Sequence, residues 1–274
     1  IASDVHGKNH HKDGGFSAFV LSIRLLQSDG TIIDCSPTEH ADCFWASCGG
    51  MGLTGIIVEA RLQLKKITSS YIQQTSQRFG NLEALMQGFA AHQQATYTVA
   101  WIDCLSKGAQ QGRGVLFVGE HAEGEDITRL PALKTHAQGK LTVPFDFPSW
   151  VLNTLSVKAF NALYYGKASD SPQNSLIHYD PFFYPLDGIH HWNRIYGKRG
   201  FVQFQCVLPD ATAYQGLQQL LSAIAESGQG SFLAVLKQLG AQGQGWCSFP
   251  MMGWTLALDF PVKPAVFQLL QKLD

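Results

Sequence analysis

The chain has 274 residues, enough for one large domain or two ordinary ones. Its formal charge is −1, and 45% of its residues are hydrophobic while 15% are charged, fewer than the usual ~25%. This balance excludes a disordered chain and an electrostatic nucleic-acid binder, and no apolar run approaches the ~20 residues of a membrane-spanning helix. We predict a globular protein with no nucleic-acid partner and no integral membrane segment.

Six cysteines are spread irregularly along the chain, and no two of them form a CxxC pair. In a chain of this length such spacing favours reduced, buried thiols over a disulfide framework. The cysteines therefore predict a reducing, cytoplasmic compartment.

Residues 1–65 form the first predicted domain. After a loop rich in glycine and histidine, the pattern predicts a strand over 19–27, a hairpin turn at 28–30, a returning strand over 31–35 and a short helix over 41–47. The glycine-rich segment 49–55 then leads into a strand with apolar residues at every second position from Ile56 to Leu64. These glycines serve either a tight turn or a close approach of a ligand to the backbone, and composition does not choose between the two.

Residues 66–274 form the second predicted domain. Asn81 is an N-cap candidate for a helix, and the pattern then predicts strands over 97–104 and 114–119. A polar segment over 120–148 leads to a helix over about 150–165, and 168–200 is aromatic-rich and irregular. Strands over 201–208, 231–239 and 254–260 alternate with helices over 214–227 and 264–274. This order predicts an antiparallel sheet with helices on one face, and an α+β fold class.

Polar side chains recur at alternate positions of the last three predicted strands. Gln203 and Gln205 share a face of the first, Lys237 lies on the second, and Thr255 and Ala257 share a face of the third with Asp259. If these strands pair, one side of the sheet carries two amides and an ammonium, as a site for a polyhydroxylated ligand requires. A plain solvated sheet face is the commoner meaning of such a pattern.

Two other kinds of chemistry have weak support. His6, His10 and His11 invite a metal site, but the flanking glycines oppose the helix that would align them and no carboxylate or cysteine stands at ligand spacing. A serine hydrolase is disfavoured because the chain has no Gly-x-Ser-x-Gly motif. We predict no metal.

Several blocks of the sequence together resemble one family. They are Ala2-Ser3-Asp4-Val5-His6-Gly7-Lys8-Asn9-His10-His11, Phe44-Trp45-Ala46 through Gly49-Gly50 to Ile57, Tyr184-Pro185-Leu186-Asp187 with Trp192-Asn193-Arg194, and Gly253-Trp254 through Asp259-Phe260-Pro261. This pattern resembles the FAD-linked oxidases of the vanillyl-alcohol-oxidase (PCMH) type, and within them the oxidases of prenylphosphoryl pentoses.

The resemblance implies a fold. Residues 1–65 would be the latter part of a PCMH-type FAD-binding domain, and 66–274 a substrate domain that caps the flavin. The N-terminal FAD subdomain and a C-terminal return segment of the family have no counterpart here, so the chain is expected to be an inactive piece of a longer enzyme.

Site residues follow from the resemblance position by position. The flavin-side set is Ser3, Asp4, Val5, His6, Gly52 and Ile57. The substrate-side set is Lys8, Trp101, Phe183, Gln203, Gln205, Lys237, Thr255 and Ala257. Lys237 is the candidate for orienting the substrate through its ammonium. Ala257 stands where several family members have a cysteine that covalent inhibitors attack, while Thr255, Val99 and Phe183 replace an asparagine, a serine and a tyrosine.

The implied activity is FAD-dependent oxidation of a secondary sugar hydroxyl. The expected substrate is a prenyl-phospho-pentose, which would make the protein the 2′-oxidase half of an epimerase that supplies arabinose donors to the cell wall, with a reductase as partner subunit. Attachment to the inner face of the membrane is part of the same expectation. Two alternatives are an aldonolactone or alditol oxidase of the same superfamily, and a flavin-free module that binds a carbohydrate or lipid phosphate.

Overall fold

The structure is a computed structural model that describes residues 1–123, 132–135 and 141–274. The chain divides into two compact units. The first comprises residues 1–66 together with 238–253, and the second comprises 67–237 together with 254–274. The sequence suggested a boundary after residue 65 and assigned everything after it to the second domain, so the return of 238–253 to the first unit is a feature that the pattern did not reveal.

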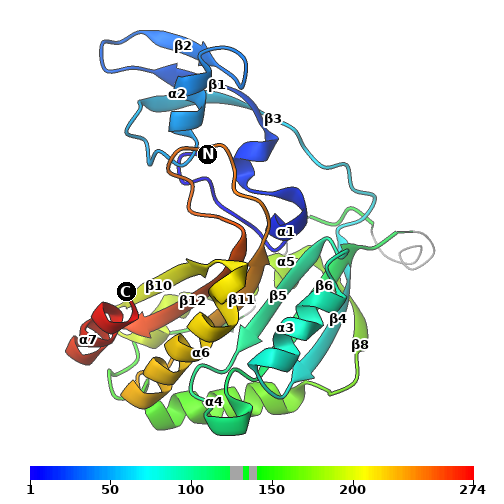
Figure 1. Ribbon diagram of the computed structural model, residues 1–274, viewed down its shortest axis with the longest axis vertical. Helices are drawn as coiled ribbons and strands as arrows, with labels where there is room; N and C mark the ends of the chain where they lie inside the picture. Colours follow the sequence, from blue (N-terminus) through cyan, green and yellow to red (C-terminus); the bar gives the residue numbers. More distant parts are fainter. Residues whose placement is uncertain (124–131, 136–140) are drawn as a thin grey trace. The chain divides into compact units, whose positions relative to one another are not determined.

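A three-stranded antiparallel sheet, in the order β2-β1-β3, forms the first unit's framework (Figure 1). The elements of this unit are α1 (His10–Asp13), β1 (Val20–Leu26), β2 (Ile32–Cys35), α2 (Ala41–Ser47) and β3 (Ile56–Leu62). Ile23 and Leu25 of β1 pack against Phe44 of α2, and all three are almost fully buried. The predicted hairpin is confirmed, with Gly30 at φ 86° between the two strands.

The predicted alternation of β3 does not decide which of its apolar residues are buried. Pairing between β1 and β3 shifts register twice, once between Val20 and Ser22 and once between Arg24 and Leu25. A bulge turns the side chains that follow it to the other face. As a result Ile57 pairs with Leu25 and packs on the core, while Ile56 is 65% exposed.

The second unit is built on a seven-stranded sheet in the order β10-β12-β11-β5-β6-β4-β8. Its strands are β4 (Tyr71–Phe79), β5 (Tyr97–Ile102), β6 (Gly114–His121), β8 (Gln173–His178), β10 (Phe201–Leu208), β11 (Ala234–Leu239) and β12 (Gly253–Pro261). The sequence did not predict β4 or β8. Both strands are mostly polar, and β8 lies at the sheet's edge with its first four residues exposed, so neither shows the apolar alternation on which strand prediction depends.

Helices cover one face of this sheet, as predicted. They are α3 (Leu82–Ala91), α6 (Asp210–Ser227) and α7 (Pro264–Leu273), which lie on the same side of the strands in Figure 1. Their apolar sides enclose a core with alternate residues of the strands, among them Leu236, Leu256 and Leu258, each 0% exposed. The predicted cap of α3 is confirmed, because Asn81 Oδ1 accepts a hydrogen bond from Ala84 N at 2.9 Å.

The stretch 168–200 is more regular than predicted. It contains β8, α5 (Tyr179–Phe183) and β9 (Ile189–His190), which pairs with β7 (Leu141–Thr142). Phe182 fills the space over Gly119 of β6, where a Cβ would collide with its ring. Part of the predicted polar segment 120–148 lies outside the described residues. Among the residues that the structure describes, no helix is both long and apolar enough to cross a bilayer.

Candidate substrate face and cofactor loops

The predicted polar side chains lie on one face of the seven-stranded sheet. Alternate residues of β10, β12 and β11 pack into the helix-covered core, which leaves Gln203, Gln205 and Lys237 on the opposite face. β12 lies between the other two strands, so the three side chains come from adjacent strands. We call this side of β10, β12, β11 and β5, with Gln203, Gln205, Lys237, Thr255, Ala257 and Trp101, the Lys237 face.

Hydrogen bonds within the protein orient both amides. Gln203 Nε2 donates to Asp259 Oδ1 at 2.9 Å, and Gln205 Nε2 donates to Thr255 Oγ1 at 3.1 Å. Since a carboxylate only accepts, the Asp259 contact fixes which end of the Gln203 amide is the nitrogen. The carbonyl oxygen of Gln203 therefore points away from Asp259 and is placed to accept a hydrogen bond from a ligand hydroxyl.

Lys237 carries its ammonium on a half-buried side chain. Burial lowers the pKa of Lys237 from 10.5 to about 8, because removal from water disfavours the charged form. Such a group gains from a ligand that brings oxygen atoms or negative charge to it. The β11–β5 register places Val235 opposite Trp101, so Lys237, two positions further along β11, lies on the same face of the sheet as Trp101.

Aromatic side chains border the Lys237 face. The indole Nε1 of Trp101 donates to Phe232 O at 3.0 Å, which fixes the ring, and Phe183 of α5 packs edge-on against Tyr97 with 4.9 Å between centroids. Thr255 is 0% exposed, so its hydroxyl acts on Gln205 and its role toward a ligand is indirect.

Asp259 is a residue of this face that the predicted site set does not include. It is 7% exposed, and burial raises its pKa while the hydrogen bond from Gln203 opposes the rise. The alternation that singled out Gln203 also places Asp259 beside it, so the register of the two strands was the signal that could have found it.

The predicted flavin-side loop belongs to the first unit. Asp4 is buried, with φ 39°, and its carboxylate accepts from Ser17 N at 2.7 Å, Ser17 Oγ at 2.9 Å and Ser248 Oγ. These bonds occupy Asp4 inside the protein, and its neighbours Ser3 and Val5 are exposed. The structure therefore gives Asp4 the role of holding the loop in place.

The glycine-rich segment divides into two kinds of position. A Cβ on Gly50 would collide with Ala46 O, and one on Gly49 would lie 3.0 Å from Ser248 N, so these glycines permit close packing of the chain on itself. Gly52, at φ 80°, has nothing within 4 Å of a Cβ position. Among the glycines of the segment 49–55, Gly52 is thus the one that leaves room for a ligand near the backbone.

The remaining predicted residues are also placed in the first unit. The His6 ring stacks on Phe249 at 6.1 Å and meets His10 edge-on at 6.0 Å, while Lys8 and Ile57 are half-buried. Over the described ranges no cluster of three metal-ligating side chains occurs. The substrate-side set is therefore split, since Lys8 belongs to the first unit and the other seven residues belong to the second.

Comparison with known proteins supplies the family. The chain is 34% identical over its full length to decaprenylphosphoryl-β-D-ribose oxidase of Mycolicibacterium smegmatis, and spans 60% of that protein. It is 30% identical, again over its full length, to an uncharacterised Streptomyces coelicolor protein encoded in the mprA 5′ region, of which it spans 76%. The chain belongs to the FAD-linked oxidoreductases of the vanillyl-alcohol-oxidase type.

A shorter match agrees with this family. An FAD-linked oxidoreductase of Aspergillus niger, pynB, is 43% identical over 53 residues, which is 19% of the chain and 10% of that protein. A scan against protein-family models finds no match.

The first unit fits part of an FAD site, as this family requires. Ser3, Val5 and Gly52 are exposed and His6 is half-buried, while hydrogen bonds hold the buried Asp4 in place between them. Backbone presented in this way can lie close to a flat or extended cofactor without side chains in between. We propose Ser3, Val5, His6 and Gly52 as the residues that contact the cofactor there.

Proposed function

We propose that the full-length protein is an FAD-dependent oxidoreductase that oxidises a secondary hydroxyl of a prenyl-phospho-pentose. The name of the Mycolicibacterium smegmatis relative supports this substrate class, since the alignment covers every residue of the present chain. The chain itself contributes the substrate unit and part of the cofactor site.

The observation that carries the proposal is the convergence of Gln203, Gln205 and Lys237 on one sheet face. When bound, FAD accepts the hydride from the carbinol carbon. The chain's own side chains position the sugar, with the Gln203 carbonyl oxygen accepting from a hydroxyl and Lys237 Nζ donating to a phosphate or sugar oxygen. Trp101 and Phe183 border the face on the side of β5.

The composition of the face narrows the sugar. Ala257 and Val99 add no polar group, and the Thr255 hydroxyl already serves Gln205. Two amides and one ammonium therefore carry recognition. A sugar hydroxyl buried against the apolar positions without a partner would cost about 1–3 kcal/mol, which favours a pentose over a longer polyol with more hydroxyls to satisfy.

The proposed reaction implies a second enzyme. Oxidation of a ring hydroxyl gives a ketone, and inversion of that carbon is complete only when a reductase returns a hydride to the opposite face. We propose a separate reductase subunit in this role, and arabinose-donor synthesis for the cell wall as the setting.

A substrate panel tests the proposal. The full-length flavoprotein would be assayed by reduction of an artificial dye with a prenyl-phospho-ribose, with free alditols and with aldonolactones. We expect turnover of the prenyl-phospho-ribose alone. Turnover of lactones or alditols instead would establish the related oxidase activity, and a colourless protein that takes up no added FAD would show a binding module.

A further inference from the structure

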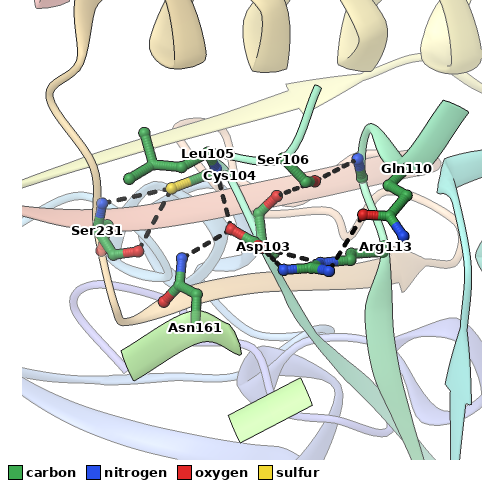
Figure 2. Close-up of polar contacts among 9 residues, drawn as sticks. Asp103, Cys104, Leu105, Ser106, Gln110, Arg113, Asn161 and Ser231 are labelled. Atoms are coloured by element: carbon green, nitrogen blue, oxygen red, sulfur yellow. Dashed lines mark hydrogen bonds and ion pairs between the residues drawn. The ribbon is translucent and has the colours of Figure 1, made fainter. Parts of the chain in front are cut away.

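The helix α4 (Thr154–Lys167) has a polar anchor on its inner side. Asn161 is 0% exposed, and its Nδ2 donates to Asp103 Oδ1 at 2.8 Å (Figure 2). The other carboxylate oxygen of Asp103 accepts from Nε and Nη2 of Arg113 at 3.0 and 2.9 Å. This network holds α4 against the strands through charged and amide groups, and Val157 adds an apolar contact on the same side.

The outer side of α4 is apolar. Leu155 is 78% exposed and Leu163 is 69% exposed, and the small residues Ala159, Ala162 and Gly166 are exposed between and beside them. These five positions fall on one stripe of the helix at about 100° per residue. We call this stripe, with Trp150 just before the helix, the α4 outer face; Trp150 is 72% exposed.

Apolar side chains of α4 also face the protein, where Phe160 packs against Phe232 and Tyr164 against Trp101. The leucines of the outer face are therefore a second apolar stripe, in addition to the one that an ordinary surface helix turns toward its core. Neither leucine contributes to the apolar core formed by the described residues. Exposed apolar patches of this kind mark sites of contact with other molecules or with membranes.

The charged residues of α4 indicate what kind of molecule contacts the outer face. Lys158 and Lys167 are exposed and fall on opposite sides of the apolar stripe, and α4 contains no acidic residue. Asp146 is the one acidic residue in 141–167. An apolar stripe flanked by lysines and preceded by tryptophan is the pattern of helices that lie in the interface of an anionic bilayer.

We propose that the α4 outer face docks on an anionic lipid bilayer, with Leu155, Leu163 and Trp150 entering the interface and Lys158 and Lys167 contacting lipid phosphates. This inference rests on the proposed function and extends it, because a bilayer is where a prenyl-phospho-sugar resides. It is tested without any turnover, so its failure and that of the proposed oxidation are distinguishable.

Vesicle flotation of the full-length protein tests the surface. We expect binding to phosphatidylcholine–phosphatidylglycerol vesicles, weaker binding to pure phosphatidylcholine, and loss of the difference at high salt. The double variant Leu155→Ser/Leu163→Ser should lower binding roughly tenfold or more. Lys158→Gln and Lys167→Gln should each lower it about fivefold.

A matched control variant and a check of folding distinguish a loss of membrane docking from a loss of folded structure. Phe267→Ser changes a side chain on α7 that is 47% exposed and should leave vesicle binding unchanged. Each variant should keep the far-ultraviolet circular dichroism and flavin content of the parent, since the altered side chains are outside the core.

Three results would overturn the proposal. The first is a parent protein that does not float with anionic vesicles, and the second is binding that the α4 variants leave unchanged. The third is a dimer, seen by light scattering, that Leu155→Ser/Leu163→Ser dissociates, because the α4 outer face would then be an interface between two copies of the chain.

Discussion

Replacing Lys237 with methionine should stabilise the protein while removing its activity. The pKa of Lys237 is about 8 in the folded protein against 10.5 for an exposed lysine, with burial as the cause. At ~1.4 kcal/mol per pKa unit this difference corresponds to at most about 3.5 kcal/mol of destabilisation at neutral pH. Methionine has a similar length and no charge, so Lys237→Met should recover most of that free energy.

The pH dependence gives the prediction its sign. Between pH 8 and 10.5 the unfolded chain binds more protons at this lysine than the folded protein does, so the destabilisation is full below pH 8 and fades as the pH rises toward 10.5. Urea unfolding followed by tryptophan fluorescence should therefore show a stability gain for Lys237→Met that is large at pH 7 and small at pH 10. A destabilised variant, or a gain that does not change with pH, would refute the reasoning.

Three further predictions concern single side chains. Asn161→Ala removes a buried donor to Asp103 and should lower the free energy of unfolding by about 1–3 kcal/mol in urea titrations. An unchanged urea midpoint would show that this hydrogen bond does not anchor α4. Asn81→Ala should cost about 1 kcal/mol by the same measurement, through the lost cap of α3, whereas Asn81→Asp, which keeps an accepting oxygen, should restore most of it. Ala257→Cys should place a thiol on the Lys237 face that iodoacetamide modifies and bound substrate protects, as mass spectrometry of the labelled peptide would show; a thiol that labels equally with and without substrate would remove Ala257 from the site.

Much of the second unit could be predicted from alternation alone. β10 was predicted with its observed bounds, and the face shared by Gln203 and Gln205 followed from spacing, because both neighbouring positions are apolar and enter the core. The strand β4 was missed for the opposite reason. Its side chains are mostly polar although it lies inside the sheet, and cross-strand pairing with β6 and β8 stabilises it rather than an apolar pattern of its own.

Features that depend on contacts between separate parts of the chain could not be predicted from the sequence. The bulge after Arg24 turns Ile57 into the core, and pairing geometry rather than residue type decides this. The roles of Gly50 and Gly52 differ because a Cβ on Gly50 would collide with Ala46 O, whereas one on Gly52 would meet nothing. The sequence motif alone does not distinguish the two glycines. Asp4 likewise matched a cofactor loop by resemblance, while its carboxylate is held by Ser17 and by Ser248, the second of which is 244 residues further along the chain.

Rapid mixing of the oxidised, full-length flavoprotein with a prenyl-phospho-ribose in the absence of oxygen tests the central claim most directly. Loss of the flavin absorbance reports oxidation of the sugar in a single turnover, and Lys237→Met serves as the comparison. We predict fast bleaching in the parent, and bleaching slowed at least a hundredfold, by roughly 3 kcal/mol of lost orientation, in a variant that keeps its full content of FAD. Equal rates in the two proteins would contradict the assignment of the Lys237 face as the wall that holds the sugar.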